Sequence, residues 1–335
     1  MTNPLSRREA LSALVAAASV PLFAQDAAAQ NAAPVANWPT RPLRILIGFP
    51  GGSTPDLVAR TIADPLSKAL GQPVVVDNRP GAAGNIAADA VVRATDNHTI
   101  GVMINGNMTI AKLLNSATPF DPVRDLAPIS LIGTAPLLLA APANAPGANA
   151  VEFFAAARSA GNTWSYGSPG VGTVGHIGME LLKSKAGIDP VHVPYPGNPQ
   201  VINAMISGQV QMALLPPGLA VQQIRAGKLK AIGVTSRGRS SLVPDIPSLD
   251  ESGVTKDFQL EIWTAAAAPQ SMPKPIVARL SQLIADIART PDVREKLFAQ
   301  GWQVAGTTAE GLANRVKADT ALLGGIIKAR GIKAE

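Results

Sequence analysis

The sequence predicts an α/β protein in which parallel sheets carry helices on both faces, arranged as two similar halves and a helical tail. From residue 43 onward, short apolar runs alternate with amphipathic segments, and glycine or proline bounds most of them. This alternation is typical of βαβ units. With 335 residues, 47% hydrophobic and 16% charged, the chain is long and apolar enough for two domains with buried cores.

The first half reads as three strand–helix pairs followed by two apolar runs. We expect strands at 43–49, 73–78 and 99–104, helices at 56–70, 85–95 and 108–114, and apolar runs at 126–132 and 135–142. Each helix segment repeats apolar residues at helical spacing, and Gly71 follows the first one as a stop signal.

The second half repeats the order of elements without repeating the sequence. We expect helices at 150–160, 173–187, 199–208 and 218–227, and strands at 163–168, 190–195, 210–216, 228–236 and 258–269. The tail contains helices at 274–289, 291–301 and 308–331. Their apolar faces must be buried, and the natural place is back on the first half.

The N-terminus has the pattern of an export signal. Arg7 and Arg8 precede an apolar stretch from Leu11 to Phe23, and small residues around Ala28 follow. We therefore predict that residues 1–30 are a cleaved signal peptide and that the protein is periplasmic. The paired arginines resemble the twin-arginine type, but the usual Phe and Lys are missing, so general secretory export stays open.

Composition and motifs exclude several classes of function. The net charge is +6, but the basic residues are scattered and aromatics make up 4%, so no nucleic-acid partner is predicted. The absence of cysteine excludes disulfides and thiolate metal sites. The three histidines lack metal-site spacing, and no G-x-S-x-G nucleophile motif exists. We predict no catalytic residues, no metal and no cofactor.

The first glycine loop, "FPGGSTPD" (residues 49–56), lies between the first predicted strand and helix. Backbone N–H groups and hydroxyls at a helix N-terminus can hold an anion. A nucleotide-binding P-loop would need a lysine, which this loop lacks, and Asp56 would repel a multiply charged phosphate. The loop is equally compatible with a carboxylate site and with a tight turn capped by Asp56 or Thr54.

The second glycine loop, "YGSPGVGTVG" (residues 166–175), contains a formal G-x-G-x-x-G. The acid that a dinucleotide fold requires is misplaced, because Asp189 precedes the next predicted strand. The remaining signal is a second helix start rich in small and hydroxyl residues. Two such loops, one in each half, could aim two helix dipoles at one carboxylate without any lysine or arginine.

Taken together, these segments make the chain resemble the Bug-type extracytoplasmic solute receptors, the binding proteins of tripartite tricarboxylate transporters. The resemblance runs from residue 38 almost to the end, through "WPTRPLRILIGFPGGS", "GQPVVVDNRPGAAGNIAADAV", "FDPVRDLAPISLIG", "YGSPGVGTVGH", "VHVPYPG", "AGKLKAIGVTS" and "VPDIPSLDESG". It implies a two-lobed Venus-flytrap fold, each lobe a mostly parallel sheet flanked by helices. Lobe 1 would comprise 38–140 with 262–335, and lobe 2 would comprise 141–261.

The resemblance also implies a function and a set of site residues. A small organic acid would be held between the lobes by N–H groups, hydroxyls and ordered water, and a monomeric receptor would deliver it to the large and small permease subunits. The expected ligand-binding residues are Phe49, Gly51, Gly52, Ser53, Thr54, Ser168, Gly172 and Thr173, with Asn105, Tyr195 and Pro216 near the distal end.

Two departures from the family pattern affect these expectations. Pro50 stands alone and Pro55 is inserted before Asp56, which shifts the glycines by one place. The wall formed by "QMALLPPG" lacks the usual acid and asparagine. This apolar wall favours a ligand with an aromatic or aliphatic body. A receptor that presents its ligand to a sensor kinase is one alternative, and a periplasmic hydrolase or nucleotide-dependent oxidoreductase is another.

Overall fold

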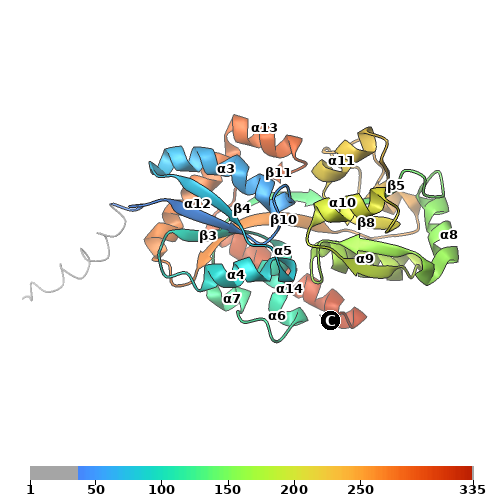
Figure 1. Ribbon diagram of the computed structural model, residues 1–335, viewed down its shortest axis with the longest axis horizontal. Helices are drawn as coiled ribbons and strands as arrows, with labels where there is room; N and C mark the ends of the chain where they lie inside the picture. Colours follow the sequence, from blue (N-terminus) through green and yellow to red (C-terminus); the bar gives the residue numbers. More distant parts are fainter. Residues whose placement is uncertain (1–36, 334–335) are drawn as a thin grey trace, which may run out of the picture. The chain divides into compact units, whose positions relative to one another are not determined.

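The computed structural model describes residues 37–333, and the helices and strands described below all lie in one unit that begins at Arg41. The predicted signal peptide lies outside the described residues. The unit from Arg41 onward contains two sheets, each flanked by helices (Figure 1).

The first sheet joins strands from both ends of the unit. Its six strands run in the order β11-β4-β10-β3-β1-β2, with bounds β1 (Leu43–Ile47), β2 (Val74–Asn78), β3 (Thr99–Ile104), β4 (Leu126–Pro136), β10 (Glu261–Pro269) and β11 (Gln303–Val304). Strand β1 pairs in parallel with β2 and β3, whereas β10 is antiparallel to β3 and β4.

Helices cover both faces of this sheet (Figure 1). One face carries α3 (Thr54–Leu70), α12 (Lys274–Arg289) and α13 (Pro291–Ala299). The other carries η1 (Ala82–Gly84), α4 (Asn85–Val92), α5 (Asn105–Thr109), α6 (Ala111–Leu114), α7 (Pro122–Asp125) and α14 (Ala309–Arg330). Side chains of α4, α5 and α14 pack around the fully buried Trp263 of β10.

The second sheet has five strands in the order β7-β6-β8-β5-β9. Their bounds are β5 (Leu138–Pro142), β6 (Ser165–Ser168), β7 (Val191–Pro194), β8 (Met212–Leu215) and β9 (Leu229–Val234). On one face lie α10 (Asn198–Ile206) and α11 (Pro217–Arg225), and on the other α8 (Ala150–Ala160) and α9 (Val174–Ala186). Short turns η2 (Gly161–Thr163) and η3 (Asp250–Ser252) complete the elements.

These sheets confirm the predicted two-lobed α/β class and refine it, because both are mixed. Strands β6, β7 and β8 are parallel, but β5 runs antiparallel to β8 and β9. Strand β5 follows the first crossing between the sheets and β10 follows the second, and β11 also runs antiparallel to its neighbour β4. The single helix expected at 108–114 is two short helices separated at Ile110. The two-residue β11 was not predicted, since so short a strand leaves no periodicity to detect.

One threonine ties together the two chain crossings between the sheets. The chain leaves the first sheet at Leu137 and returns at Leu260. Backbone hydrogen bonds link Thr235 to these two residues, at 2.9 and 3.1 Å. Its hydroxyl accepts from the Leu137 N–H at 2.8 Å and donates to the Leu260 carbonyl at 2.6 Å. Thr235 therefore joins the two crossings through four hydrogen bonds.

The C-terminal helix α14 contacts both lobes. It packs against β4 and α5 of the first lobe, and it also contacts α9 of the second. No helix in residues 37–333 combines the length and the apolar character that a membrane span requires.

Candidate functional site

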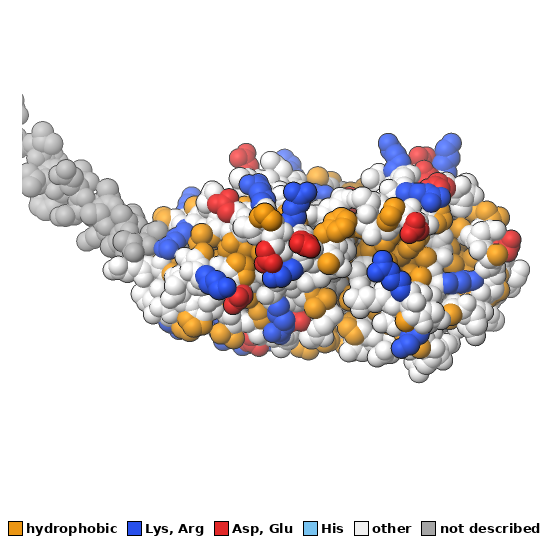
Figure 2. Space-filling view, turned by 90° about the horizontal axis from the view of Figure 1, so that it is seen from above, with side chains coloured by type: hydrophobic (Ala, Val, Ile, Leu, Met, Phe, Trp, Pro, Cys, Tyr) orange, Lys and Arg blue, Asp and Glu red, His pale blue; other side chains and the backbone are white. Residues whose placement is uncertain are grey.

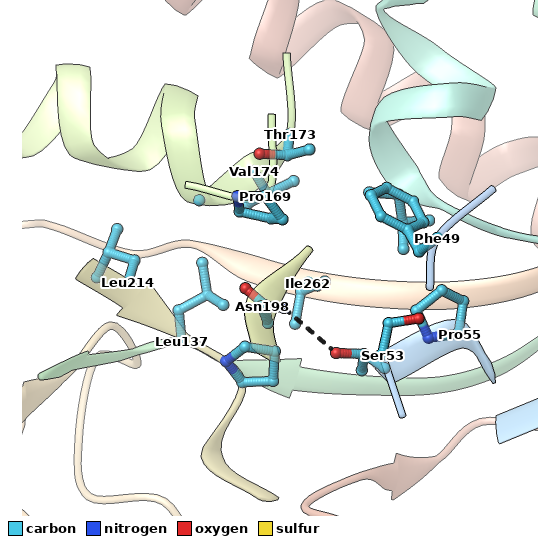
Figure 3. Close-up of a pocket in the computed structure, with 14 residues that line it drawn as sticks. Phe49, Ser53, Pro55, Leu137, Pro169, Thr173, Val174, Asn198, Leu214 and Ile262 are labelled. Carbon is cyan, nitrogen blue, oxygen red and sulfur yellow. Dashed lines mark hydrogen bonds between the residues drawn. The ribbon is translucent and has the colours of Figure 1, made fainter. Parts of the chain in front are cut away.

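A cavity lies between the lobes, at the ends of strands from both sheets (Figure 3). This is the edge at which open α/β sheets place their ligands. The space open to the centre of a water molecule is about 20 Å³, roughly one water's worth. We call it the interlobe cavity, and it is lined by Phe49, Ser53, Thr54, Pro55, Ile104, Leu137, Pro169, Thr173, Val174, Gly175, Asn198, Leu214, Pro216 and Ile262.

Four helices of nine or more residues begin at this cavity. Thr54 is the first residue of α3, Val174 of α9 and Asn198 of α10, and Pro216 immediately precedes α11. The partial positive charges of helix N-termini therefore converge on one small space. The contribution of α11 is the weakest, because Pro216 and Pro217 have no N–H to offer.

The start of α3 presents hydroxyls and unpaired backbone donors. Ser53 precedes the helix, and its side chain makes no capping hydrogen bond. Its backbone N–H is satisfied by the Pro50 carbonyl, and that of Leu57 by Ser53. Within the described residues, the N–H groups of Thr54 and Asp56 have no protein partner. They are the orphan donors that a helix start leaves for water or a ligand.

The acid of this loop points away from the interlobe cavity. Asp56 is buried, and its carboxylate accepts the N–H of Gly52 at 2.9 Å, Arg60 Nε at 3.0 Å and Asn78 Nδ2 at 2.9 Å. Burial raises the pKa of Asp56, but the hydrogen bonds from Arg60, Gly52 and Asn78 and the charge of Arg60 outweigh it, so the pKa lies below 3.8. The carboxylate thus shapes the loop, and its charge is balanced locally.

The second glycine loop, Ser168–Thr173, is folded onto its own hydroxyls. Thr173 lines the cavity, and its hydroxyl donates to the Gly170 carbonyl at 2.8 Å. Ser168 is fully buried, with Oγ 2.7 Å from His192 Nε2 and 3.2 Å from the Gly170 N–H. The backbone N–H groups of Val174 and Gly175 have no protein partner within the described residues, so they are the free donors of this wall.

One side-chain contact crosses the cavity from lobe to lobe. Asn198 Nδ2 lies 3.4 Å from Thr54 Oγ1, drawn as the dashed line that starts at Asn198 in Figure 3. Two buried polar atoms beside it, Ser53 Oγ and Asn198 Oδ1, have no hydrogen-bond partner among the described residues. Unsatisfied polar atoms at this depth are costly, which indicates a place for a polar ligand atom or a water.

The rest of the lining is apolar and uncharged. Figure 3 shows Leu137, Leu214 and Ile262 facing the polar helix starts across the space. Among the described residues, the lining contains no Lys, Arg, Asp or Glu. On the surface seen in Figure 2, acidic and basic side chains are interspersed without forming one large patch.

The lobes touch around the cavity through glycines. A Cβ at Gly218 of α11 would lie 1.8 Å from the carbonyl oxygen of Gln300 in the first lobe. One at Gly106 would lie 2.7 Å from the carbonyl oxygen of Gly172 in the second lobe. Such backbone approaches require the absence of a side chain.

Five of the predicted ligand-binding residues line this cavity, namely Phe49, Ser53, Thr54, Thr173 and Pro216. The other predicted residues lie elsewhere. Gly51 and Gly52 are exposed outside the lining, Ser168 is buried behind it, and Gly172 lines a neighbouring cavity with Asn107.

The two remaining predicted residues belong to other environments. Asn105 lines a cavity beside Glu261 and Arg315 and donates to the Glu261 carbonyl at 3.1 Å. Tyr195 is half-buried and packs against the core of the second lobe.

Asn198 is the polar residue that sequence reasoning missed. It follows Gly197 and precedes Pro199, a pattern that favours a helix start. The same search that found the two glycine loops could have found it, since it too marks a βα junction. Its proximity to Thr54 of the other lobe depends on the tertiary arrangement.

The closest approach to a catalytic constellation is the Ser168–His192 pair. The hydroxyl is buried and does not reach the interlobe cavity, so it has no access to a substrate there. Among residues 37–333, no group of three or more His, Cys, Asp or Glu side chains is arranged to hold a metal ion.

Comparison with known proteins gives consistent matches. The family model of the tripartite tricarboxylate transporter family receptor matches residues 58–332. The periplasmic binding protein BugD is 30% identical, with a TM-score of 0.84, covering 89% of this chain and 100% of that one. MatC from Rhodopseudomonas palustris with bound malate is 31% identical, with a TM-score of 0.82, over 87% and 100%. An R. palustris protein with adipate is 28% identical, with a TM-score of 0.85, over 88% and 99%.

Proposed function

The chain belongs to the tripartite tricarboxylate transporter receptors as a Bug-type member, and on this basis we propose that it captures a small organic acid between its two lobes. The observation that carries the proposal is the convergence of helix starts on a cavity without charged side chains among its described lining residues. A carboxylate fits such a site, because oriented N–H groups and hydroxyls can balance one negative charge.

The ligand's carboxylate is best placed near the starts of α3 and α9. Ser53 and Thr54 face it from lobe 1, and Val174 and Gly175 offer free N–H groups from lobe 2. Of the predicted residues, Phe49, Ser53, Thr54, Thr173 and Pro216 remain in the proposed ligand site. Gly51, Gly52, Asn105, Ser168, Gly172 and Tyr195 would act through loop shape or at the periphery.

The apolar part of the lining defines the class of acid. Leu137, Leu214, Pro216 and Ile262 offer no partner to additional charges. An aliphatic or aromatic body gains from contact with these side chains, whereas a second buried charge would lack a cation. We therefore propose a carboxylate with an apolar body. Benzoate, a monocarboxylate with an aromatic body, is the first candidate to try. Malate and adipate, the dicarboxylates bound by the related R. palustris proteins, test whether a second carboxylate is accepted.

Ligand entry requires the lobes to part, since the cavity holds about one water. We place the bend at the Leu137 and Leu260 crossings, within four residues of the predicted lobe boundaries at 140/141 and 261/262. Closure around the ligand would present a surface composed of both lobes to a permease. Export, periplasmic location, a monomeric state and delivery to permease subunits complete the proposed role of a receptor without catalysis.

Isothermal calorimetry with malate, adipate and benzoate, each against its amide, tests this function. We expect at least one acid to bind and its amide not to bind. Asn198→Ala should lower the affinity for that acid about tenfold, which corresponds to about 1.4 kcal/mol of binding free energy. The control Asn203→Ala changes an exposed asparagine of the same helix and should leave the affinity unchanged. Equal binding of acids and amides, or equal effects of both variants, would contradict the proposed site.

A further inference from the structure

The glycine loop of lobe 2 is held from behind by histidine side chains. Gly172 donates its backbone N–H to His176 Nδ1 at 3.2 Å. Ser168 Oγ is 2.7 Å from His192 Nε2 and also within hydrogen-bond distance of the Gly170 N–H. Two backbone N–H groups of the loop therefore depend, directly or through Ser168, on these two rings.

The rings form a continuous stack. His176 lies 4.2 Å from His192, centroid to centroid, with 22° between the planes. His192 stacks in turn on Tyr166 at 4.8 Å and 21°. The Tyr166 hydroxyl donates to Glu180 at 2.5 Å, which anchors the far end of the stack to α9.

The hydrogen bond from Gly172 is possible in only one protonation state. A ring nitrogen that accepts an N–H must carry no proton of its own. Protonation of His176 at Nδ1 would place two donors face to face and push the Gly172 backbone away. Since Thr173 follows Gly172 and begins the cavity wall, this displacement would reach the ligand site.

We propose that His176 is a positioning residue that holds the lobe 2 glycine loop in its binding shape only while its ring is neutral, so that ligand capture weakens in acid. This inference rests on the proposed carboxylate-binding function and adds a pH dependence to it. His176 acts through Gly172 and does not line the interlobe cavity itself.

Among residues 37–333, the charged groups that line the cavity beside the rings come from three segments. Glu180 and Lys183 belong to α9, Asp189 precedes β7, and Arg330 and Lys333 come from the end of α14. Lys183 Nζ lies 3.4 Å from Glu180 and 3.2 Å from Asp189.

The neighbouring ring, His192, favours its neutral form. Burial, the adjacent His176 and the charge of Lys183 lower the pKa of His192 to about 3. Two rings stacked at this distance also resist being charged together. His192 is therefore neutral near pH 7, so His176 is the ring whose protonation the proposal concerns.

The test uses His176→Asn, whose side-chain oxygen can replace Nδ1 as acceptor but cannot titrate. Benzoate affinity is measured by calorimetry from pH 7.5 to 5.0 and corrected for the ionised fraction of benzoate. We expect the wild-type affinity to fall at least fivefold over this range. The affinity of His176→Asn should be within threefold of the wild-type value at pH 7.5 and should not fall as the pH is lowered to 5.0. His176→Leu should bind weakly at both pH 7.5 and pH 5.0. An unaltered pH profile in His176→Asn would overturn the proposal.

A second readout separates this inference from the function on which it rests. The amide resonance of Gly172 is followed by NMR in the ligand-free protein over the same pH range. It should titrate in wild type and stay constant in His176→Asn, with circular dichroism confirming that both are folded. A Gly172 amide that does not titrate in wild type overturns the role of His176. Titration without binding of any carboxylate supports that role and refutes the proposed function.

Discussion

The two glycine loops have the same position in their lobes but are supported by different chemistry. The lobe 1 loop, Phe49–Asp56, is shaped by an ionised carboxylate that accepts from Gly52, Arg60 and Asn78. The lobe 2 loop, Ser168–Thr173, is shaped by neutral histidine rings and hydroxyls. An ionised acid can therefore lie beside an anion site if its carboxylate points away from the cavity and pairs with a cation, as Asp56 does with Arg60. A neutral support achieves the same shape but becomes sensitive to mild acid.

Removing the charged support should have the largest effect. Asp56→Ala leaves the Gly52 N–H without its acceptor and Asn78 Nδ2 with only the Phe49 carbonyl. We expect a loss of about 2 kcal/mol in the free energy of unfolding, measured by urea denaturation. The expected loss is modest because the Arg60 side chain is 54% exposed. The control Asp64→Ala lies on the same helix, where its side chain is 82% exposed, and should change stability by less than about 0.5 kcal/mol. Equal losses would show that Asp56 contributes no more than a surface acid.

The next effect concerns how closely the two loops can approach. Gly218→Ala adds a Cβ where the Gln300 carbonyl already lies, so the lobes should not close fully. We expect at least tenfold weaker ligand binding and no compaction by small-angle scattering on adding ligand.

A matched control for Gly218 exists in α14. Gly325 is also helical, and no atom lies within 4 Å of an added Cβ. The Gly325→Ala variant should therefore bind the ligand with unchanged affinity, and it should be more stable because alanine has the higher helix propensity. Normal compaction in Gly218→Ala would mean that the observed contact between the lobes is not needed for closure.

The pH dependence of stability should distinguish the two supports. The pKa of His192 is lowered from 6.5 to about 3 in the folded protein. Between these two pH values, His192 is protonated in the unfolded chain but neutral in the folded protein. Stability should fall as the pH drops from 6.5 towards 3, by at most about 1.4 kcal/mol per unit. The pKa of Asp56 is lowered from 3.8, so its contribution is complete above that pH and is lost only in stronger acid.

The change in Tm between pH 7.0 and 4.5 therefore reports on the histidine support of lobe 2 and not on Asp56. His192→Gln should flatten the decline in Tm over this range, while Asp56→Asn should shift the whole curve without changing its slope. A slope that responds to Asp56→Asn and not to His192→Gln would reverse the assignment of the two supports.

The smallest expected effect is that of salt on ligand binding. Both loops would bind the carboxylate without a charged side chain among the described lining residues. Raising NaCl from 50 to 500 mM should then change the ligand Kd by less than about threefold, because there is no exposed ion pair to screen. A tenfold loss would indicate a lysine or arginine acting on the ligand.

Much of the fold could be predicted because each element leaves a local signal. The bounds of α8 and β3 agree with the predicted ranges to the residue. Thr99–Ile104 is wholly buried and reads as a continuous apolar run, and Ala150–Ala160 repeats apolar residues at helical spacing after an Asn cap. The mixed pairing of β5 and β10 left no such signal, since strand direction depends on distant partners.

The order of elements and the two glycine-rich helix starts could be predicted from the sequence, because composition and periodicity are local properties of the chain. The family was indicated by the resemblance of its motifs to those of a known family. Which groups face the cavity depends instead on how the chain folds. Folding turns Asp56 outward onto Arg60, leaves Gly51 and Gly52 outside the lining, and brings Asn198 within 3.4 Å of Thr54. These outcomes depend on residues from opposite lobes or on the rotation of a helix about its axis. No single stretch of sequence encodes them.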